Sequence, residues 1–165
     1  MGEYAEYHLR GDVTHILAEG WDCAVFFPPC TYLTNAGNTH YYSQRRPNQI
    51  QAIEFVKSLW DSPIDRIAIE NPVGVLSTEW RKPDQYIQPC WFGDPYIKKT
   101  CLWLKGLPKL EPTEMCRAEA VPWVRDRVKQ YKSSEVRDPK RRGITFQGIA
   151  NAMAEQWSKY LIENS

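Results

Sequence analysis

The sequence lacks the features of a secreted or membrane-bound protein. Residues 1–7 contain no apolar segment of the kind found in signal peptides, and no stretch approaches the ~20 apolar residues that span a bilayer. The five cysteines are an odd number without a C-x-x-C pair, which indicates neither a disulfide framework nor a zinc knuckle. We therefore expect a cytoplasmic protein without a membrane partner or a bound metal.

An excess of charge of either sign is absent too. The 21 basic and 20 acidic residues give a formal net charge of +1, so any contact with nucleic acid must come from local patches. With 165 residues, 42% of them hydrophobic, we expect a single domain over 1–165. Aromatic residues serve cores and base stacking equally well, and we take a role in the core as the default.

A short apolar run that ends in two prolines lies near the start of the chain. Residues 22–27 have the aromatic and β-branched content of a buried strand. Pro28 and Pro29 have no backbone N–H to donate, so the strand must end there and present Cys30 on a loop. Open α/β sheets place their chemistry at such carboxyl ends of strands.

The same arrangement recurs after a helix. Apolar residues every three or four positions from Ile50 to Trp60 predict an amphipathic helix that is entered through Pro47 and ends before Pro63. A second apolar strand then leads into Glu70-Asn71-Pro72. Strand, helix and strand at this spacing predict a βαβ unit with parallel strands, so Cys30 and Glu70 should face one crevice.

The rest of the chain offers fewer signals. Residues 73–96 are interrupted by prolines and predict an irregular connection, whereas 98–106 predict a strand and 145–162 a helix. The charged residues within 111–143 fit a solvated face or, beside a DNA site, a phosphate clamp. Two similar interpretations, a solvated loop or a contact with phosphate and base, apply to Tyr41, Tyr42, Arg45 and Arg46.

A cysteine and a glutamate at neighbouring strand ends form a pair that can activate an electron-poor ring. The thiolate can add to carbon 6 of a pyrimidine while the carboxyl group hydrogen-bonds or protonates nitrogen 3, which makes carbon 5 nucleophilic. Asn71 could hold Glu70 or the local backbone in place. The alternatives are a buried, inert Cys30 thiol and an exposed Glu70 in a salt bridge.

Four motifs, in order, resemble those of DNA cytosine-5 methyltransferases. They are Pro29-Cys30, Glu70-Asn71-Pro72, Lys98-Lys99-Thr100 at the start of a strand, and Gln147 to Ala152 at the start of the last helix. The chain is most similar to short phage and prophage proteins usually labelled DNA cytosine methyltransferase, over nearly the whole length from Gly11 to Trp157. The resemblance implies an α/β fold with a partial Rossmann-like methyltransferase sheet, mostly parallel, and flanking helices.

By position, the resemblance also implies roles for individual residues. Cys30 is the nucleophile and Glu70 is the acid. The residues expected beside a cytosine flipped out of DNA are Pro29, Thr31, Asn35, Asn71, Lys98, Lys99 and Thr100. Pro28 and Asn151 are expected near the cofactor, S-adenosylmethionine. Lysines stand where the wider family has arginines, so bidentate contacts to the substrate are lost.

One part of the family's pattern is missing from the sequence. The family opens with a strand and a Phe-x-Gly-x-Gly turn that holds S-adenosylmethionine, and only about twenty residues precede the nucleophile strand here, without such a turn. Three hypotheses follow: a subunit that another chain completes, a fragment or decayed relative that keeps the fold but not methylation, or another use of the crevice. Without the opening strands of the family's sheet, the exposed edge of the Cys30 strand needs a cover, which the N-terminal segment or a second copy of the chain could supply, and we expect self-association as a homodimer.

Two classes of function follow from these features. The first is a DNA cytosine-5 methyltransferase, complete by itself or only with a partner chain. The second is a catalytically inactive methyltransferase-fold module that binds DNA or protein. A metal protein that uses cysteine and histidine is a third alternative.

Overall fold

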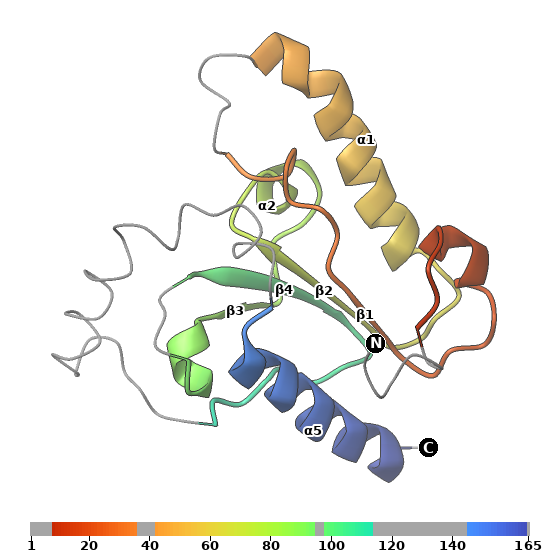
Figure 1. The fold of residues 1–165 in the computed structure, drawn as a ribbon, viewed down its shortest axis with the longest axis vertical. Helices are drawn as coiled ribbons and strands as arrows, with labels where there is room; N and C mark the ends of the chain where they lie inside the picture. The colour runs from red at the N-terminus through yellow and green to blue at the C-terminus, as the bar shows by residue number, and fades with distance from the viewer. Residues whose placement is uncertain (1–7, 36–41, 95–97, 114–144, 165) are drawn as a thin grey trace, which may run out of the picture.

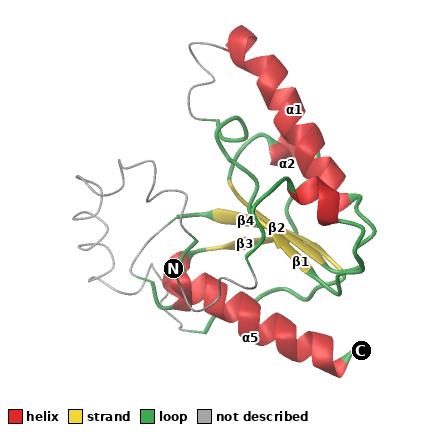
Figure 2. Cartoon of the chain, turned by 45° about the vertical axis from the view of Figure 1, so that its right-hand side comes forward, coloured by secondary structure: helices red, strands yellow, loops and turns green. Residues whose placement is uncertain are grey.

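The computed structural model describes residues 8–35, 42–94, 98–113 and 145–164. In these residues a four-stranded sheet lies between two long helices, α1 (Tyr42–Trp60) and α5 (Gln147–Glu163). Figure 1 shows α1 on one side of the sheet and α5 on the other, and the turned view in Figure 2 keeps this order. The described part of the chain is therefore a mixed α/β structure with helices on both faces of the sheet, as the sequence predicts.

The predicted βαβ unit is present. Strands β1 (Ala24–Phe26) and β2 (Ile67–Pro72) pair in parallel, with Ala24 opposite Ile67 and Phe26 opposite Ile69. Helix α1 connects the two strands. The carboxyl ends of β1 and β2 therefore meet at one edge of the sheet, where the chain continues into Pro28 and Pro29 from one strand and into Val73 from the other.

Helix α1 starts earlier than the sequence predicts. It begins at Tyr42, and Pro47 lies inside it rather than at its entry. Arg45 and Arg46 in the turn before the proline donate hydrogen bonds to Thr31 and Glu79, which lie outside the helix. These tertiary contacts hold the first turn, and a reading of local propensity alone cannot detect them.

The buried face of α1 also differs from its prediction. Ile53, Val56 and Leu59 are buried as expected. Ile50, which the apolar spacing assigns to the core, is 46% exposed, whereas the polar Gln49 is 1% exposed. A polar side chain therefore occupies the end of the buried stripe that lies nearest the loop after β1.

The sheet is mixed, and the expectation of a mostly parallel sheet is wrong. Strand β4 (Thr100–Lys105) lies between β2 and β3 (Gln85–Ile87) and is antiparallel to both, in the order β1-β2-β4-β3. Strands β3 and β4 follow one another along the chain and pair antiparallel, and no crossover helix lies in the described part of their connection. The sequence predicts β4 but reads 73–96 as irregular, because β3 has only three residues between two prolines.

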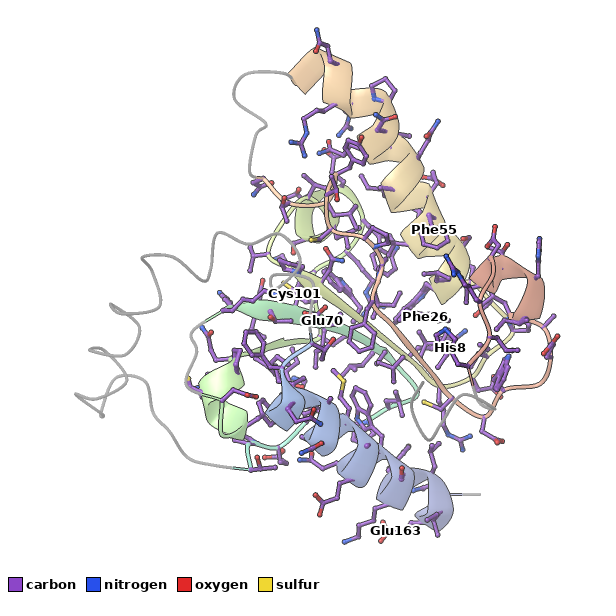
Figure 3. The ribbon with its side chains drawn as sticks, viewed as in Figure 1. His8, Phe26, Phe55, Glu70, Cys101 and Glu163 are labelled. Carbon is purple, nitrogen blue, oxygen red and sulfur yellow. The ribbon has the colours of Figure 1, made fainter. Side chains whose placement is uncertain are left out.

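Each face of the sheet has its own hydrophobic core. Residues of α1 pack with Ile67 and Ile69 of β2 and with Trp103 of β4 on one face. Phe26 and Phe55 are packed against this core and are labelled in Figure 3. On the other face, α5 packs against Ala68 and Leu102. Side chains alternate between the two faces along each strand, so neighbouring residues of β2 serve different cores.

Short helices complete the described structure. A single turn, η2 (Val13–Ile16), precedes β1, and the Asp12 carboxylate at its start accepts a hydrogen bond from the Thr14 backbone N–H at 2.9 Å. Helix α2 (Leu76–Glu79) follows β2, and η3 (Pro89–Phe92) follows β3. No helix in the described ranges is long and apolar enough to cross a bilayer. Most of the charged segment 111–143, like Tyr41, lies outside the described residues.

Candidate functional site

A pocket of ≈ 120 Å³ lies where the carboxyl ends of β1 and β2 meet the first turn of α5. A cavity that holds a single water needs a volume of only about 10–15 Å³, so this pocket has room for a small molecule. Six residues singled out in the sequence line the pocket: Pro28, Pro29, Cys30, Glu70, Asn71 and Lys98. The other lining residues are Phe27, Pro72, Thr145, Phe146 and Ile149.

Cys30 is held at the pocket by the turn that follows it. Its carbonyl oxygen accepts hydrogen bonds from the backbone N–H groups of Leu33 at 3.0 Å and Thr34 at 3.1 Å. Leu33 is buried in the core and accepts a hydrogen bond from the Val75 N–H at 2.8 Å. Gly74 permits this close approach, because a β-carbon at that position would overlap the Leu33 carbonyl oxygen.

The Cys30 thiol differs in its exposure from the thiol of Cys101 on β4. Cys30 is partly exposed and lines the pocket, so the alternative of a buried residue does not hold. Cys101 of β4 is fully buried, and burial raises the pKa of its thiol to about 11. A buried thiol of that kind is inert at neutral pH, since the thiolate is the nucleophile.

Glu70 points from β2 toward the side of the sheet that α5 covers. It alternates with Ile69, which faces α1, and shares its face with Ala68. Figure 3 labels Glu70 and Cys101, which belong to opposite faces of the sheet. Burial raises the pKa of the Glu70 carboxyl group above its usual range, and the nearby Lys98 ammonium opposes this shift. A carboxyl group with a raised pKa retains its proton more readily and can act as a hydrogen-bond donor or an acid.

Asn71 joins the two strand ends. Its Nδ2 donates a hydrogen bond to the Pro28 carbonyl oxygen at 2.8 Å, and the residue is 1% exposed. Of the two roles predicted for Asn71, it performs the one that holds local backbone. Its Oδ1 is buried and accepts no hydrogen bond within the described part of the chain. Buried acceptors without a partner are uncommon, and this one belongs to a residue that lines the pocket.

Lys98 and the start of α5 form the opposite wall. The Lys98 ammonium nitrogen lies 5.5 Å from the centre of the Phe146 ring, within the range of a cation–π contact. The first turn of α5 is fixed by Asp94, whose Oδ2 accepts a hydrogen bond from the Gly148 N–H at 2.8 Å. Gly148 packs so closely on the Phe92 carbonyl that a β-carbon would overlap it. The Phe146 wall is therefore set by backbone packing.

Five residues predicted for the site do not line the pocket: Thr31, Asn35, Lys99, Thr100 and Asn151. Thr31 and Asn35 are exposed on the loop after Cys30. Thr100 is buried in β4, and its hydroxyl donates to the Lys98 carbonyl oxygen at 3.1 Å. The Lys99 ammonium nitrogen lies 4.0 Å from the centre of the Tyr86 ring. Of the three strand-start residues, Lys98 alone reaches the pocket.

Of the two residues predicted near S-adenosylmethionine, one lines the pocket and the other does not. Pro28 lines the pocket, and its carbonyl oxygen is bonded to Asn71. Asn151 is exposed on α5 and accepts a hydrogen bond from Gln147 Nε2 at 2.7 Å. Ahead of β1, the described residues form the short turn η2 rather than a strand and a glycine-rich turn. The described residues therefore do not fit S-adenosylmethionine.

Sequence reasoning missed the aromatic walls of the pocket. Phe27, Thr145 and Phe146 were assigned no role, although all three line it. Phe27 is 47% exposed, directly before the two prolines. No local signal indicates that Phe146 faces the strand ends, because its position depends on the packing of Gly148 on Phe92. Nothing local indicates Thr145.

The pocket brings together a thiol, a carboxyl group with a raised pKa, an ammonium group and aromatic side chains. These groups can bind a flat ring, add a nucleophile to it and supply a proton to it. The two reacting groups come from adjacent parallel strands, so the sheet itself sets their spacing. Comparisons with protein-family models, with curated proteins and with solved structures find no match to this chain.

Proposed function

We propose that this protein is a DNA cytosine-5 methyltransferase-like protein in which Cys30 adds to a cytosine that has been flipped out of DNA. The observation that carries the proposal is that Cys30 and Glu70 line one pocket at the ends of two adjacent parallel strands. The partial exposure of Cys30 and the raised pKa of Glu70 suit a nucleophile and an acid, respectively.

In the proposed reaction, the Cys30 thiolate forms a bond to carbon 6 of the ring. Glu70 donates a hydrogen bond or its proton to nitrogen 3, and the displaced electron pair makes carbon 5 nucleophilic. The Phe27 and Phe146 walls suit a planar ring, and the free Oδ1 of Asn71 suits an amino group on it. Lys98 adds positive charge beside the ring.

The proposal includes S-adenosylmethionine as the methyl donor and a Rossmann-like relationship of the fold. The donor would have to be held by residues other than the described ones, or by a complementing subunit or second copy, and we derive no step through it. In support of the fold relationship, β1, β2 and β3 run in one direction and helices cover both faces of the sheet. The mixed pairing limits the relationship to a partial sheet.

A second candidate function is a catalytically inactive methyltransferase-fold module that binds DNA or protein. The observation that favours it is the lack of fit to S-adenosylmethionine among the described residues. This candidate predicts DNA binding that weakens with salt, because phosphate contacts release counterions. It also predicts that no bond of the cytosine ring changes.

Hydrogen exchange at carbon 5 of cytosine separates the two candidates without a methyl donor. Addition of the thiolate lets carbon 5 take up a deuteron from D₂O, and loss of the original proton followed by elimination of Cys30 returns a labelled cytosine. We expect wild type and Cys23→Ala to label a cytosine-containing oligonucleotide and Cys30→Ala to label none, as measured by mass spectrometry of the nucleosides. Equal labelling by wild type and Cys30→Ala would remove the catalytic proposal. Binding of the oligonucleotide without labelling would favour the second candidate.

A further inference from the structure

Few polar side chains in the described part of the chain are buried. They are Gln49, Ser62, Asn71 and Thr100, with exposed fractions of 1%, 6%, 1% and 1%. Burial of an amide costs free energy unless the group is hydrogen-bonded, so each such position needs a structural reason. Two of the four, Gln49 and Asn71, donate to backbone carbonyls on either side of Cys30. Two of the four buried polar side chains therefore hold the backbone next to Cys30.

Gln49 is bonded at both ends of its side-chain amide. Its Nε2 donates to the Tyr32 carbonyl oxygen at 3.1 Å, and its Oε1 accepts a hydrogen bond from Arg46 at 2.7 Å. Arg46 also makes two hydrogen bonds to the Glu79 carboxylate, at 3.1 and 2.8 Å. A chain of hydrogen bonds thus runs from the loop through α1 to α2. Bidentate pairs of this kind fix geometry as well as adding energy.

Arg45 makes a second contact from α1 to the same loop. Its guanidinium group donates to the Thr31 carbonyl oxygen at 2.6 Å and lies 5.7 Å from the centre of the Tyr32 ring. Both arginines of the predicted basic cluster therefore contact the protein itself. With Asn71 on Pro28, side chains hold the backbone carbonyls at three positions within two residues of Cys30.

From these contacts we infer that Gln49 is a positioning residue, which with Arg45 and Arg46 fixes the orientation of the Cys30 thiol in the pocket. Within the described ranges, the loop between Pro28 and Leu33 has no strand pairing, so side-chain hydrogen bonds take the place of a ladder. The expected effect on catalysis rests on the proposed function, whereas the positioning of the loop does not. Misplacement of a nucleophile by about 1 Å costs on the order of 100-fold in rate, and binding of the ring by the aromatic walls is unaffected.

The test compares two changes at Gln49 in the full chain. Gln49→Met keeps the volume and removes both hydrogen bonds, whereas Gln49→Glu keeps the acceptor for Arg46 and loses the donor to Tyr32. We expect both variants to lower kcat for carbon 5 hydrogen exchange about 100-fold with KM within about twofold of wild type. The exposed Gln51 on the same helix is the matched control, and Gln51→Met should match wild type. Wild-type kcat in both Gln49 variants would overturn the inference.

A second readout keeps the inference distinguishable from the proposed function. Each cysteine is alkylated with iodoacetamide, and the labelled peptides are quantified by mass spectrometry. We expect Cys30 to react about tenfold faster in Gln49→Met, because a released loop exposes the thiol, while the buried Cys90 and Cys101 remain as slow as in wild type. An unchanged Cys30 rate would overturn the inference even if wild type shows no exchange at all. Faster labelling of all three cysteines would also overturn it, since that pattern indicates general unfolding.

Arg45→Met provides an independent variant, should Gln49→Met fail to fold. It removes the bond to Thr31 at the solvent-exposed end of α1 and leaves the buried amide in place. The expected result is a rise of about threefold in Cys30 alkylation and a tenfold loss of kcat, since one of the loop contacts is removed. Arg45→Met indistinguishable from wild type in both measurements would contradict the proposed role of α1.

Discussion

The ends of β1 and β2 lie side by side at the pocket, yet they are held by different kinds of contact. Glu70 belongs to a strand that pairs on both sides, with β1 and with β4. Cys30 follows a strand of three residues whose one partner among the described strands is β2, and side chains of α1 and β2 fix the loop that carries it. Backbone pairing fixes the position of the Glu70 carboxyl group, whereas a few side-chain hydrogen bonds fix the position of the Cys30 thiol.

This difference indicates which part of the site tolerates change. A central strand retains its register when one side chain is altered, because the backbone hydrogen bonds of both neighbours remain. A loop held by individual hydrogen bonds loses its conformation when one donor is removed. We therefore expect substitutions near Cys30 to disturb the site more than comparable substitutions near Glu70.

The largest effect is expected for Gly74→Ala. The added methyl group would overlap the Leu33 carbonyl oxygen, and the turn after Cys30 would have to move away. We expect the free energy of unfolding, measured by urea denaturation, to fall by about 3 kcal/mol. Gly11→Ala is the control, because no heavy atom lies within 4 Å of a β-carbon there, and it should change stability by less than about 0.5 kcal/mol. Equal stability of the two variants would show that the turn is not fixed by this contact.

A smaller loss is expected for Asn71→Ala. The change removes the donor to the Pro28 carbonyl oxygen and leaves that oxygen without this bond. The expected cost is about 2 kcal/mol in urea denaturation, together with faster alkylation of Cys30. Asn71→Asp fills the same space without a donor and should lose as much. An aspartate variant as stable as wild type would contradict the assigned hydrogen bond.

Ile69→Val tests whether β2, the strand that carries Glu70, tolerates a change in one side chain. Ile69 is fully buried in the core that faces α1, directly before the acid. Removal of one methylene should cost about 1 kcal/mol and leave the alkylation rate of Cys30 unchanged. A change in that rate as large as the one in Asn71→Ala would show that the two strand ends respond alike, and would contradict the greater sensitivity expected of the Cys30 loop.

The smallest effect concerns the pH dependence of stability. Burial raises the pKa of Glu70 in the folded protein. The contribution of this group to folding stability is therefore fully present below pH 4.5, its ordinary pKa, and is lost as the pH rises through the folded-state pKa. Glu70→Gln removes this loss, and its free energy of unfolding should rise relative to wild type as the pH increases above 4.5.

Glu79→Gln should show the opposite sign. Hydrogen bonding by Arg46 lowers the pKa of the Glu79 carboxyl group. The contribution of Glu79 to folding stability is therefore present above pH 4.5 and is lost as the pH falls through the folded-state pKa. The variant should be less stable than wild type at neutral pH, by a small amount because Glu79 is exposed. Two pH profiles of the same sign would contradict one of the assigned causes.

The sequence predicted those parts of the site that depend on local signals. Pro28 and Pro29 must end a strand wherever it lies, and an apolar run that leads into Glu70-Asn71-Pro72 reads the same way. Together with a helix between the two runs, these signals are enough to predict parallel pairing and a shared crevice. The roles assigned to Thr31, Lys99 and Asn151 came from resemblance alone, and none of these residues lines the pocket.

Other features depend on contacts between distant segments. The direction of β4 is set by its partners on both sides, and the three residues of β3 carry too little pattern to be recognised. Gln49 reads as a polar residue beside an apolar stripe, and only its contact with Tyr32 shows why it is buried. Likewise, Phe146 reaches the pocket because Gly148 packs on Phe92, which no local signal predicts.

The central claim is that the thiol and the acid act on the same ring. Its most direct test is the rate of carbon 5 hydrogen exchange in a cytosine-containing oligonucleotide for Glu70→Gln, beside Glu54→Gln from the exposed face of α1. We expect a fall of about 100-fold for Glu70→Gln, as for loss of a general acid, and wild-type exchange for Glu54→Gln. Exchange by Glu70→Gln within twofold of wild type would contradict the claim.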